Sequence, residues 1–355
     1  MAPRTPGSSS DPTAGRSGEP VTRRRSPTSK GGPGRIRVST VVDGTARDYE
    51  GEAALKALPG LLGQPESSVW VDLAAPSAHQ VEAVGRVLGL HPLIVEDVLE
   101  GNQRAKIEST DGVVHIVLFA LDREQTVVVN EVDLVLGLGY LLTVHDVTWD
   151  PFVSHHLRDG VAPILRHGPD HLLWAIGDDI VDGYFPYADR LGDAIDEVQD
   201  AVMREANPRT LERLFALKRE LVDVRRAASP TREVLNQLTN RELALIDPEE
   251  TIYFRDIYDH VIRLTDELDN YRELAASTLD VYLTQVNNNL SVIMKRLTGV
   301  TVIVAGIGAV AGIFGMSEAG TALAGGEPGG FWTITALTLI GATGAALVLR
   351  RIGWI

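Results

Sequence analysis

The chain has no cysteine among its 355 residues, which excludes disulfide bonds and thiolate metal sites. Any metal ion must therefore be held by oxygen or imidazole ligands. The sequence also lacks a G-x-x-x-x-G-K-[ST] loop to cradle a phosphate, and it shows no nucleophile paired with a base. These absences disfavour an ATPase or a hydrolase, and we expect a protein that is not an enzyme.

Basic residues are in deficit, with 33 Lys and Arg against 48 Asp and Glu and a net charge of −15. The deficit lies in residues 37–296, which hold 24 basic and 44 acidic groups. An acidic body of this size repels phosphates and concentrates cations around it. The charge therefore argues against nucleic acid as a partner.

The first 36 residues have almost no large apolar side chain, and 22 of them are Gly, Pro, Ser or Thr. This composition buries too little surface to offset the entropy lost on ordering, so we expect a disordered tail over residues 1–36. The tail lacks the apolar stretch of a secretory signal. Its run Arg23-Arg24-Arg25 is interpreted as a chance basic run in preference to a contact with anionic lipid.

The body of the chain shows two patterns and predicts an α+β fold. Residues 37–168 alternate short β-branched runs with helical spacing, as in a cytoplasmic α/β domain, whereas residues 169–296 predict a helical stalk. Helix breaks are expected near Asn207-Pro208, Ser229-Pro230 and Asp247-Pro248. The expected helices of the first part are Ser77–Gly89 and Pro92–Leu99, and its expected strands are Arg37–Val42, Val69–Leu73, Gly112–Leu121, Val127–Gly137 and Tyr140–His145.

Two groups of residues in this body have side chains that can bind metal. The first, on one helix face, is interpreted as a solvated surface and comprises Asp189, Asp193, Asp196 and Asp200. The second comprises His155, His156, His167 and His171. Because Gly168-Pro169 interrupts the helical register between the last two histidines, we do not predict a zinc site.

Two uncharged stretches close the chain, at residues 297–317 and 331–349, and each is long enough to span a bilayer as a helix. Lys and Arg flank them on one side only, at residues 295–296 and in the basic tail 350–355. The connecting loop 318–330 has none, so both termini are expected in the cytoplasm. A buried hairpin of a soluble protein is disfavoured by the glycine content, the paired lengths and this asymmetry.

The first membrane span is expected to continue a long helix from the stalk, because no proline interrupts the chain from Glu249 to Glu327. A helix of about 65 residues would be about 100 Å long. An apolar seam in steps of three and four residues predicts side-by-side packing with like helices. The seam consists of Leu283, Val286, Leu290, Ile293, Leu297, Val300, Val304 and Ile307.

A second stripe on the same helix is polar or small throughout. It consists of Asp280, Thr284, Asn287, Ser291, Met294, Thr298, Thr301, Ala305, Gly308, Gly312 and Gly315. The pattern fits two interpretations equally: close helix packing through small residues, or the lining of an axial pore.

The end of this helix carries Gly315-Met316-Ser317 after Ala311–Phe314, and it resembles the CorA family of magnesium transporters, whose signature there is Tyr-Gly-Met-Asn. The resemblance extends from about residue 36 to the C-terminus. Further matching segments are residues 70–73, 91–97, 103–106, 143–145, 182–186, 253–260, 280–283, 294–298 and 350–355.

This resemblance implies a funnel-shaped homopentamer in a lipid bilayer, the cell inner (cytoplasmic) membrane, that transports Mg²⁺ through a pore lined by the first membrane helix. The implied pore and filter positions are Asp280, Ser291, Met294, Leu297, Ala305, Gly308, Gly312, Gly315, Met316 and Ser317. Met294 and Leu297 would form an apolar constriction, and carbonyls at Gly312 and Gly315 would contact the hydrated ion. Glu318 and Glu327 would raise the cation concentration at the mouth.

The resemblance also assigns a regulatory Mg²⁺ between subunits to Glu96, Asp97 and Asp256, so that cytoplasmic Mg²⁺ holds the channel closed. Ser317 departs from the family's Asn, which predicts a wider ring with weaker preference for Mg²⁺ and makes Co²⁺, Ni²⁺ and Zn²⁺ further candidate ions. Two alternatives remain: a zinc transporter of the ZntB type, and a non-conducting, membrane-anchored metal sensor or partner subunit.

Overall fold

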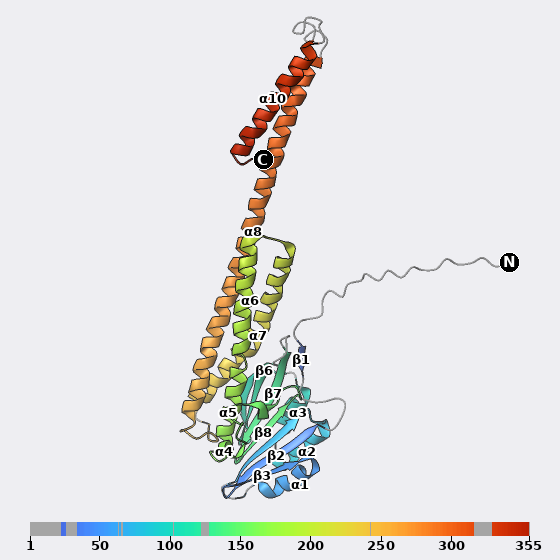
Figure 1. The fold of residues 1–355 in the computed structure, drawn as a ribbon. Helices are drawn as coiled ribbons and strands as arrows, with labels where there is room; N and C mark the ends of the chain where they lie inside the picture. Colours follow the sequence, from blue (N-terminus) through green and yellow to red (C-terminus); the bar gives the residue numbers. More distant parts are fainter. Residues whose placement is uncertain are drawn as a thin grey trace, which may run out of the picture. The chain divides into compact units, whose positions relative to one another are not determined.

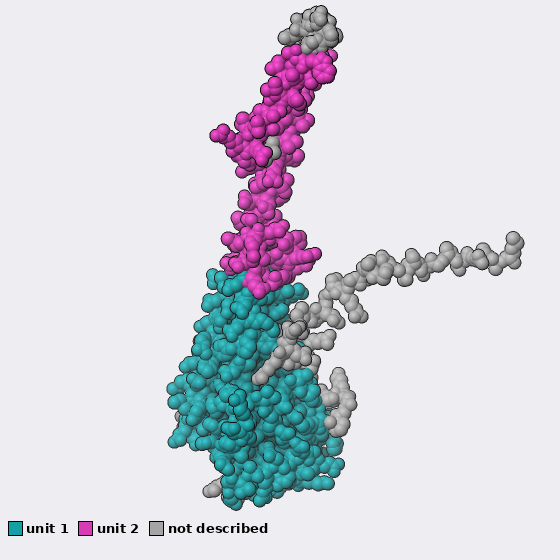
Figure 2. All heavy atoms as spheres, in the orientation of Figure 1, with its two compact units in different colours: residues 1–196, 214–275 teal, residues 197–213, 276–355 magenta. Residues whose placement is uncertain are grey.

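The computed structural model describes residues 23–25, 34–62, 64, 67–101, 103–121, 128–241, 243–315 and 329–354. It has an N-terminal α/β region, a long helix and two apolar C-terminal helices, which confirms the predicted fold class (Figure 1). The chain divides into two compact units, coloured separately in Figure 2. One unit comprises residues 1–196 and 214–275, and the other comprises residues 197–213 and 276–355.

The first unit is built on a mixed sheet with the strand order β3-β2-β4-β8-β7-β6-β5. Its strands are β2 (Arg35–Val42), β3 (Thr45–Glu50), β4 (Ser68–Ala74), β5 (Lys106–Thr110), β6 (Val113–Leu121), β7 (Val128–Gly137) and β8 (Tyr140–His145). Strands β4 and β8 are parallel, and the other neighbours along this order are antiparallel. The five predicted strands are present within one or two residues of their expected bounds.

Helices cover both faces of this sheet, which explains why its central strands are almost wholly apolar (Figure 1). Helices α1 (Gly51–Leu61), α2 (Ala78–Leu88) and α3 (Pro92–Glu100) share a core with β2, β4 and β8 that includes Leu58, Val71 and Val84. Helices α4 (Ala162–Leu165) and α5 (Pro169–Asp182) contact the sheet as well. The boundary expected at residue 168 therefore falls inside the first unit.

The prediction omitted α1 and both edge strands, β3 and β5. Strand β3 is polar and exposed, and β5 is polar apart from the buried Ile107, so neither shows an apolar alternation. Each is joined to its neighbour by an Asp-Gly turn with positive φ, Asp43-Gly44 (47° and 74°) and Asp111-Gly112 (51° and 81°). Asp-Gly between two extended runs is a strong hairpin signal, so these dipeptides could have revealed both strands.

Part of the predicted disordered tail forms strands. Residues 23–25 form β1 (Arg23–Arg25), which pairs in parallel with the start of β7, and β2 begins at Arg35. The prediction was wrong at these two places because backbone pairing along an open stretch of β7 needs no apolar side chains in the added strand. Residues 1–22 and 26–33 lie outside the described part of the chain.

Three long helices follow: α6 (Phe185–Arg204), α7 (Pro208–Asn240) and α8 (Thr251–Gly315). The breaks expected near residues 207 and 247 are confirmed, whereas the break at Pro230 was wrong because α7 continues through it. A proline weakens the hydrogen bonds of the preceding turn, and Thr231 compensates by donating its hydroxyl to the Ala227 carbonyl at 2.9 Å.

Helix α8 is 65 residues long, as the absence of proline predicted. Its apolar end and helix α10 (Gly329–Arg351) are each long and apolar enough to cross a membrane, and almost none of either stretch is buried within the chain. A buried hairpin of a soluble protein would hide these side chains, so their exposure favours the membrane interpretation. Residues 316–317 of the first predicted span lie outside the described residues.

Candidate functional site

The polar and small stripe of α8 lies exposed along the membrane end of the helix. Every described residue of the stripe from Asn287 to Gly315 is exposed in the single chain. At Gly308, Gly312 and Gly315, an added Cβ would meet nothing within 4 Å. Contacts within the chain therefore do not require glycine at these positions.

Hydroxyl groups on this stripe donate their protons to the helix itself. Ser291 Oγ donates to the Asn287 carbonyl at 3.0 Å, and Thr301 Oγ1 donates to the Leu297 carbonyl at 2.8 Å. Earlier in the helix, Thr284 Oγ1 donates to the Asp280 carbonyl at 2.9 Å. Because each proton is used in this way, the outward-facing lone pairs of these oxygens remain acceptors. Such a surface can accept hydrogen bonds from the water shell of a cation.

Helix α10 packs against the opposite side of α8. An apolar groove of about 420 Å³ lies between the two helices and is lined on α8 by Val302, Ile303, Gly306, Ile307, Val310 and Phe314. No residue of the stripe lines this groove. At about 100° per residue, the centre of the groove-facing set lies about half a turn from the centre of the stripe. The second membrane helix therefore leaves the stripe uncovered.

Most of the apolar seam is also exposed in the single chain, although Ile307 lines the groove beside α10. Leu283, Leu290 and Ile293 are 51%, 52% and 59% exposed, and Leu297 is 66% exposed. The first three precede the uncharged span, so a bilayer core around that span would not cover them. Large apolar side chains in a row at this exposure mark a surface that another protein segment covers.

The sequence-predicted filter is only partly described. Gly312 and Gly315 end α8, whereas Met316, Ser317, Glu318 and Glu327 lie outside the described residues. Of the predicted constriction, Met294 and Leu297 are both exposed on α8, at 68% and 66%. Asp280, Ala305 and Gly308 lie on the same helix.

The predicted regulatory residues occupy α3 and α8 of the first unit. Asp97 on α3 accepts a hydrogen bond from Lys106 Nζ at 2.5 Å and another from Gln103 Nε2 at 3.2 Å. Glu96 is exposed on the same helix. Asp256 on α8 is 71% exposed, and its carboxylate lies 3.9 Å from His260 Nε2. Within one chain the described contacts do not bring Asp97 and Asp256 together.

Lys106 contacts the predicted regulatory residue Asp97, and the sequence analysis did not predict this contact. It lies on β5 between Asp97 and Glu108, at 2.5 and 3.0 Å. Burial alone would lower the pKa of Lys106, but the hydrogen bonds to the two carboxylates outweigh it and the pKa is raised. The ammonium group therefore stays charged and partly neutralises Asp97. Because β5 was not predicted, nothing in the sequence placed Lys106 opposite α3.

A buried pair lies next to this cluster. His115 Nε2 on β6 contacts Asp133 Oδ1 on β7 at 2.8 Å, and both side chains are almost completely buried. Burial raises the pKa of the Asp133 carboxyl, and the charge of Asp97 raises it further. Asp97, a predicted regulatory residue, is thus electrostatically linked to the interior of the sheet.

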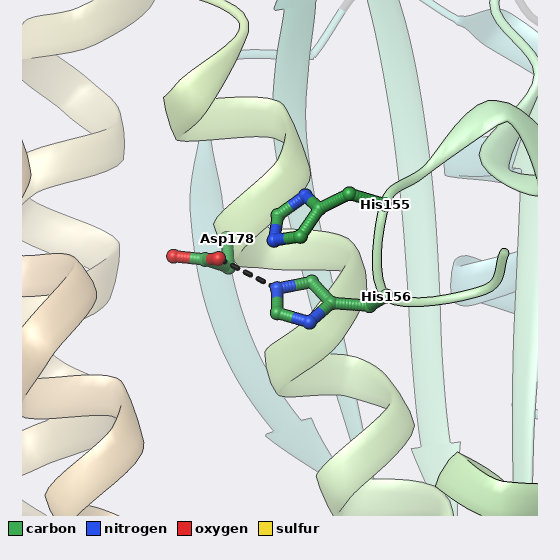
Figure 3. A group of neighbouring side chains, drawn as sticks. All are labelled: His155, His156 and Asp178. Carbon is green, nitrogen blue, oxygen red and sulfur yellow. Dashed lines mark hydrogen bonds and ion pairs between the residues drawn. The ribbon is translucent and has the colours of Figure 1, made fainter.

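Histidines after β8 form another group that the sequence analysis set aside. His155 and His156 follow the short helix η1 (Pro151–Val153) and face Asp178 on α5, with His156 Nε2 2.7 Å from Asp178 Oδ2 (Figure 3). His167 and His171 have ring centroids 4.9 Å apart, and His171 Nδ1 lies 2.7 Å from Glu250 Oε2. The predicted acidic face of α6 is exposed, as expected for a solvated surface.

Comparison with known proteins connects this architecture to one family. The chain is 36% identical over 242 residues to the cobalt/magnesium transport protein CorA of Thermotoga maritima, covering 67% of this chain and 69% of that protein. The complete structure of the CorA magnesium transporter from Methanocaldococcus jannaschii superposes with a TM-score of 0.73 at 23% identity, over 90% of this chain and 98% of that one. The full-length CmaX protein superposes with a TM-score of 0.70 at 18% identity, over 92% and 100%.

The match runs from β4 to the end of α10 and includes both membrane helices. Residues 65–351 fit the family model described as "CorA-like Mg2+ transporter protein". That range covers most of the chain and includes the long helix α8 with both of its stripes. The chain therefore belongs to the CorA-like Mg²⁺ transporter family.

Proposed function

We propose that the chain is one subunit of a homopentameric channel that passes Mg²⁺, with Co²⁺ and Ni²⁺ as further ions, across the cytoplasmic membrane. The observation that carries the proposal is the orientation of the α8 stripe, which is polar or small except at Met294, exposed and turned away from α10. Family membership and the relatives' transport of cobalt and magnesium support the choice of ions. The basic residues at 295–296 and 350–351 support a cytoplasmic location of both termini.

The exposed seam supports assembly from like subunits. Leu283, Leu290 and Ile293 repeat at the spacing of packed helices and lie outside the uncharged span. A neighbouring copy of α8 would cover them, and the stripe, which lies next to the seam, would then face the axis. Five hydroxyl oxygens at each of positions 291 and 301 would contact the water shell of the ion.

Regulation by cytoplasmic Mg²⁺ belongs to the same proposal. Asp97 of one subunit and Asp256 of the next would bind the ion together, with Glu96 nearby, and the bridge would hold the closed arrangement. Lys106 already contacts Asp97, so a Mg²⁺ ion at this position competes with an ammonium group. The threshold for inhibition therefore depends on Lys106.

Ion flux in proteoliposomes tests the function. Thr301→Val removes a stripe hydroxyl and should lower Mg²⁺ influx severalfold. Thr343→Val on α10 is the matched control, because Thr343 is also exposed and donates to the carbonyl four residues earlier, at 2.7 Å. Equal loss of flux in both variants, or no loss in Thr301→Val, would contradict a pore along this stripe.

The same preparation separates the alternatives. Greater flux of Zn²⁺ than of Mg²⁺ at matched concentrations would support a ZntB-type transporter. Absence of flux for every ion, with Mg²⁺ still bound, would support a non-conducting metal sensor or partner subunit. Cross-linking of the natural protein through its lysine amines should give a ladder that ends at five chains, because each subunit carries several amines and can be linked to both neighbours.

A further inference from the structure

The cytoplasmic unit contains a cluster of imidazole and carboxylate groups that plays no part in the proposed transport or in its regulation. We propose that His155, His156 and Asp178 form a binding site, within a single chain, for a divalent cation that prefers imidazole ligands: Zn²⁺, Co²⁺ or Ni²⁺. The two histidines come from the loop after η1, and the aspartate comes from the middle of α5 (Figure 3).

The distances between the ligand atoms of these three side chains are already close to those in a metal site. One ligand atom from each of the three side chains can be chosen so that all lie within 4.8 Å of one another. Ligands bound at about 2.1 Å in a tetrahedron are about 3.4 Å apart. His156 Nε2 and Asp178 Oδ2 are 2.7 Å apart, so a bound ion would require them to separate by less than 1 Å. The two imidazole rings lie side by side, with centroids 3.8 Å apart.

The backbone around the cluster holds the ligands in place. The His156 amide donates to Ser154 Oγ at 3.2 Å, and the His156 ring packs against Trp174 with centroids 4.7 Å apart. The side chains of His156 and Asp178 are only 16% and 11% exposed. His155 is 49% exposed and lines a cavity of about 480 Å³, which gives an ion and its remaining water ligands a route in.

A second set of ligands shares Asp178 and adds to the cation-binding capacity. Asp182 on α5 and His260 on α8 each offer an atom within 4.8 Å of Asp178 and of each other. His260 Nδ1 is buried and has no hydrogen-bond partner among the described residues. This set places the carboxylates of Asp178 and Asp182 close together, and a cation bound between them would relieve their mutual repulsion.

The arginine side chains near the cluster do not take the place of a metal ion. Arg158 and Arg190 line the same cavity, and Arg190 lies 4.0 Å from Glu220 and stacks on Tyr187. Among the described residues, neither arginine forms an ion pair with Asp178 or Asp182. Two carboxylates, those of Asp178 and Asp182, and three imidazoles, those of His155, His156 and His260, are therefore available to bind a cation.

The ligand chemistry separates this site from the one proposed for regulatory Mg²⁺. Mg²⁺ prefers an octahedron of oxygens and keeps several waters, whereas imidazole favours Zn²⁺, Co²⁺ and Ni²⁺. Glu96, Asp97 and Asp256 supply only oxygen ligands and act between subunits, whereas the histidine site is complete within one chain. The protein would therefore respond to a transition metal independently of its Mg²⁺ load.

Metal binding to the full-length protein in detergent tests the proposal without any ion gradient. Co²⁺ added in the presence of millimolar Mg²⁺ should give visible absorption bands that saturate, with Zn²⁺ displacing it. His155→Gln/His156→Gln should weaken Co²⁺ binding at least about tenfold, as should Asp178→Asn. The matched control His167→Gln changes an exposed histidine outside the cluster and should leave binding unchanged.

Unaltered Co²⁺ affinity in the double histidine variant would overturn the proposal, as would complete displacement of Co²⁺ by Mg²⁺. X-ray absorption of the Zn²⁺-loaded natural protein provides a second measurement that needs no variant. Fewer than two imidazole ligands in that spectrum would also overturn it. Because these measurements do not require transport, a chain that conducts no ion could still bind metal here, and a failed metal site would leave the conduction proposal intact.

Discussion

The exposed seam of α8 allows a quantitative prediction for assembly. Leu290 is 52% exposed in the single chain and lies before the uncharged span. Complete burial of a leucine side chain stabilises by about 1.5–3 kcal/mol, so covering the exposed half is worth about 1–1.5 kcal/mol per subunit. Five subunits would together gain about 5–7 kcal/mol at this position alone.

Leu290→Gln should remove this gain and place an amide in the interface. A loss of about 5 kcal/mol corresponds to a change of more than a thousandfold in the equilibrium for dissociation. Light scattering on the detergent-solubilised protein over a dilution series would measure the concentration at which the assembly dissociates. We expect dissociation of Leu290→Gln at concentrations where the natural protein stays assembled.

A matched control uses the same chemical change elsewhere. Leu138 is 88% exposed in the turn between β7 and β8, so Leu138→Gln should leave the assembly unchanged. Circular dichroism of both variants would verify that the helices remain formed. Dissociation curves that coincide for Leu290→Gln, Leu138→Gln and the natural chain would refute the argument that the seam is the interface between subunits.

Three further predictions concern the first unit. Lys106→Gln removes the competitor of a cation at Asp97, so half-maximal inhibition of flux should need severalfold less cytoplasmic Mg²⁺; an unchanged inhibition curve would remove Lys106 from regulation. Tyr184→Phe leaves the buried Phe119 carbonyl without its hydroxyl donor, which should cost about 1–3 kcal/mol and lower the melting temperature by several degrees. Burial alone would lower the pKa of His145, but its hydrogen bond to a buried aspartate outweighs it and the pKa is raised. Its contribution to stability is therefore complete below about pH 6.5 and is lost as pH rises through the folded-state pKa, so melting scans should show a steeper fall above pH 6.5 than in His145→Asn.

Patterns along a single helix are local, and for that reason the sequence predicted them well. Helix α8 has the length expected from the proline-free stretch of sequence. Its two stripes depend only on residues three or four positions apart. The same holds for the membrane spans, which depend on the length of an uncharged run. The two edge strands were omitted because their side chains are solvated, although their Asp-Gly turns carried a usable signal.

Sequence alone, then, determined the five inner strands, the long helix, its two faces and the family, because each follows from short-range periodicity or from a contiguous motif. Only the tertiary structure decided which side of α8 meets α10, that Lys106 neutralises Asp97, and that His155 and His156 meet Asp178. These contacts join residues that are distant in sequence or lie on different elements. Packing of the sheet and helices sets such distances, and no spacing along the chain encodes them.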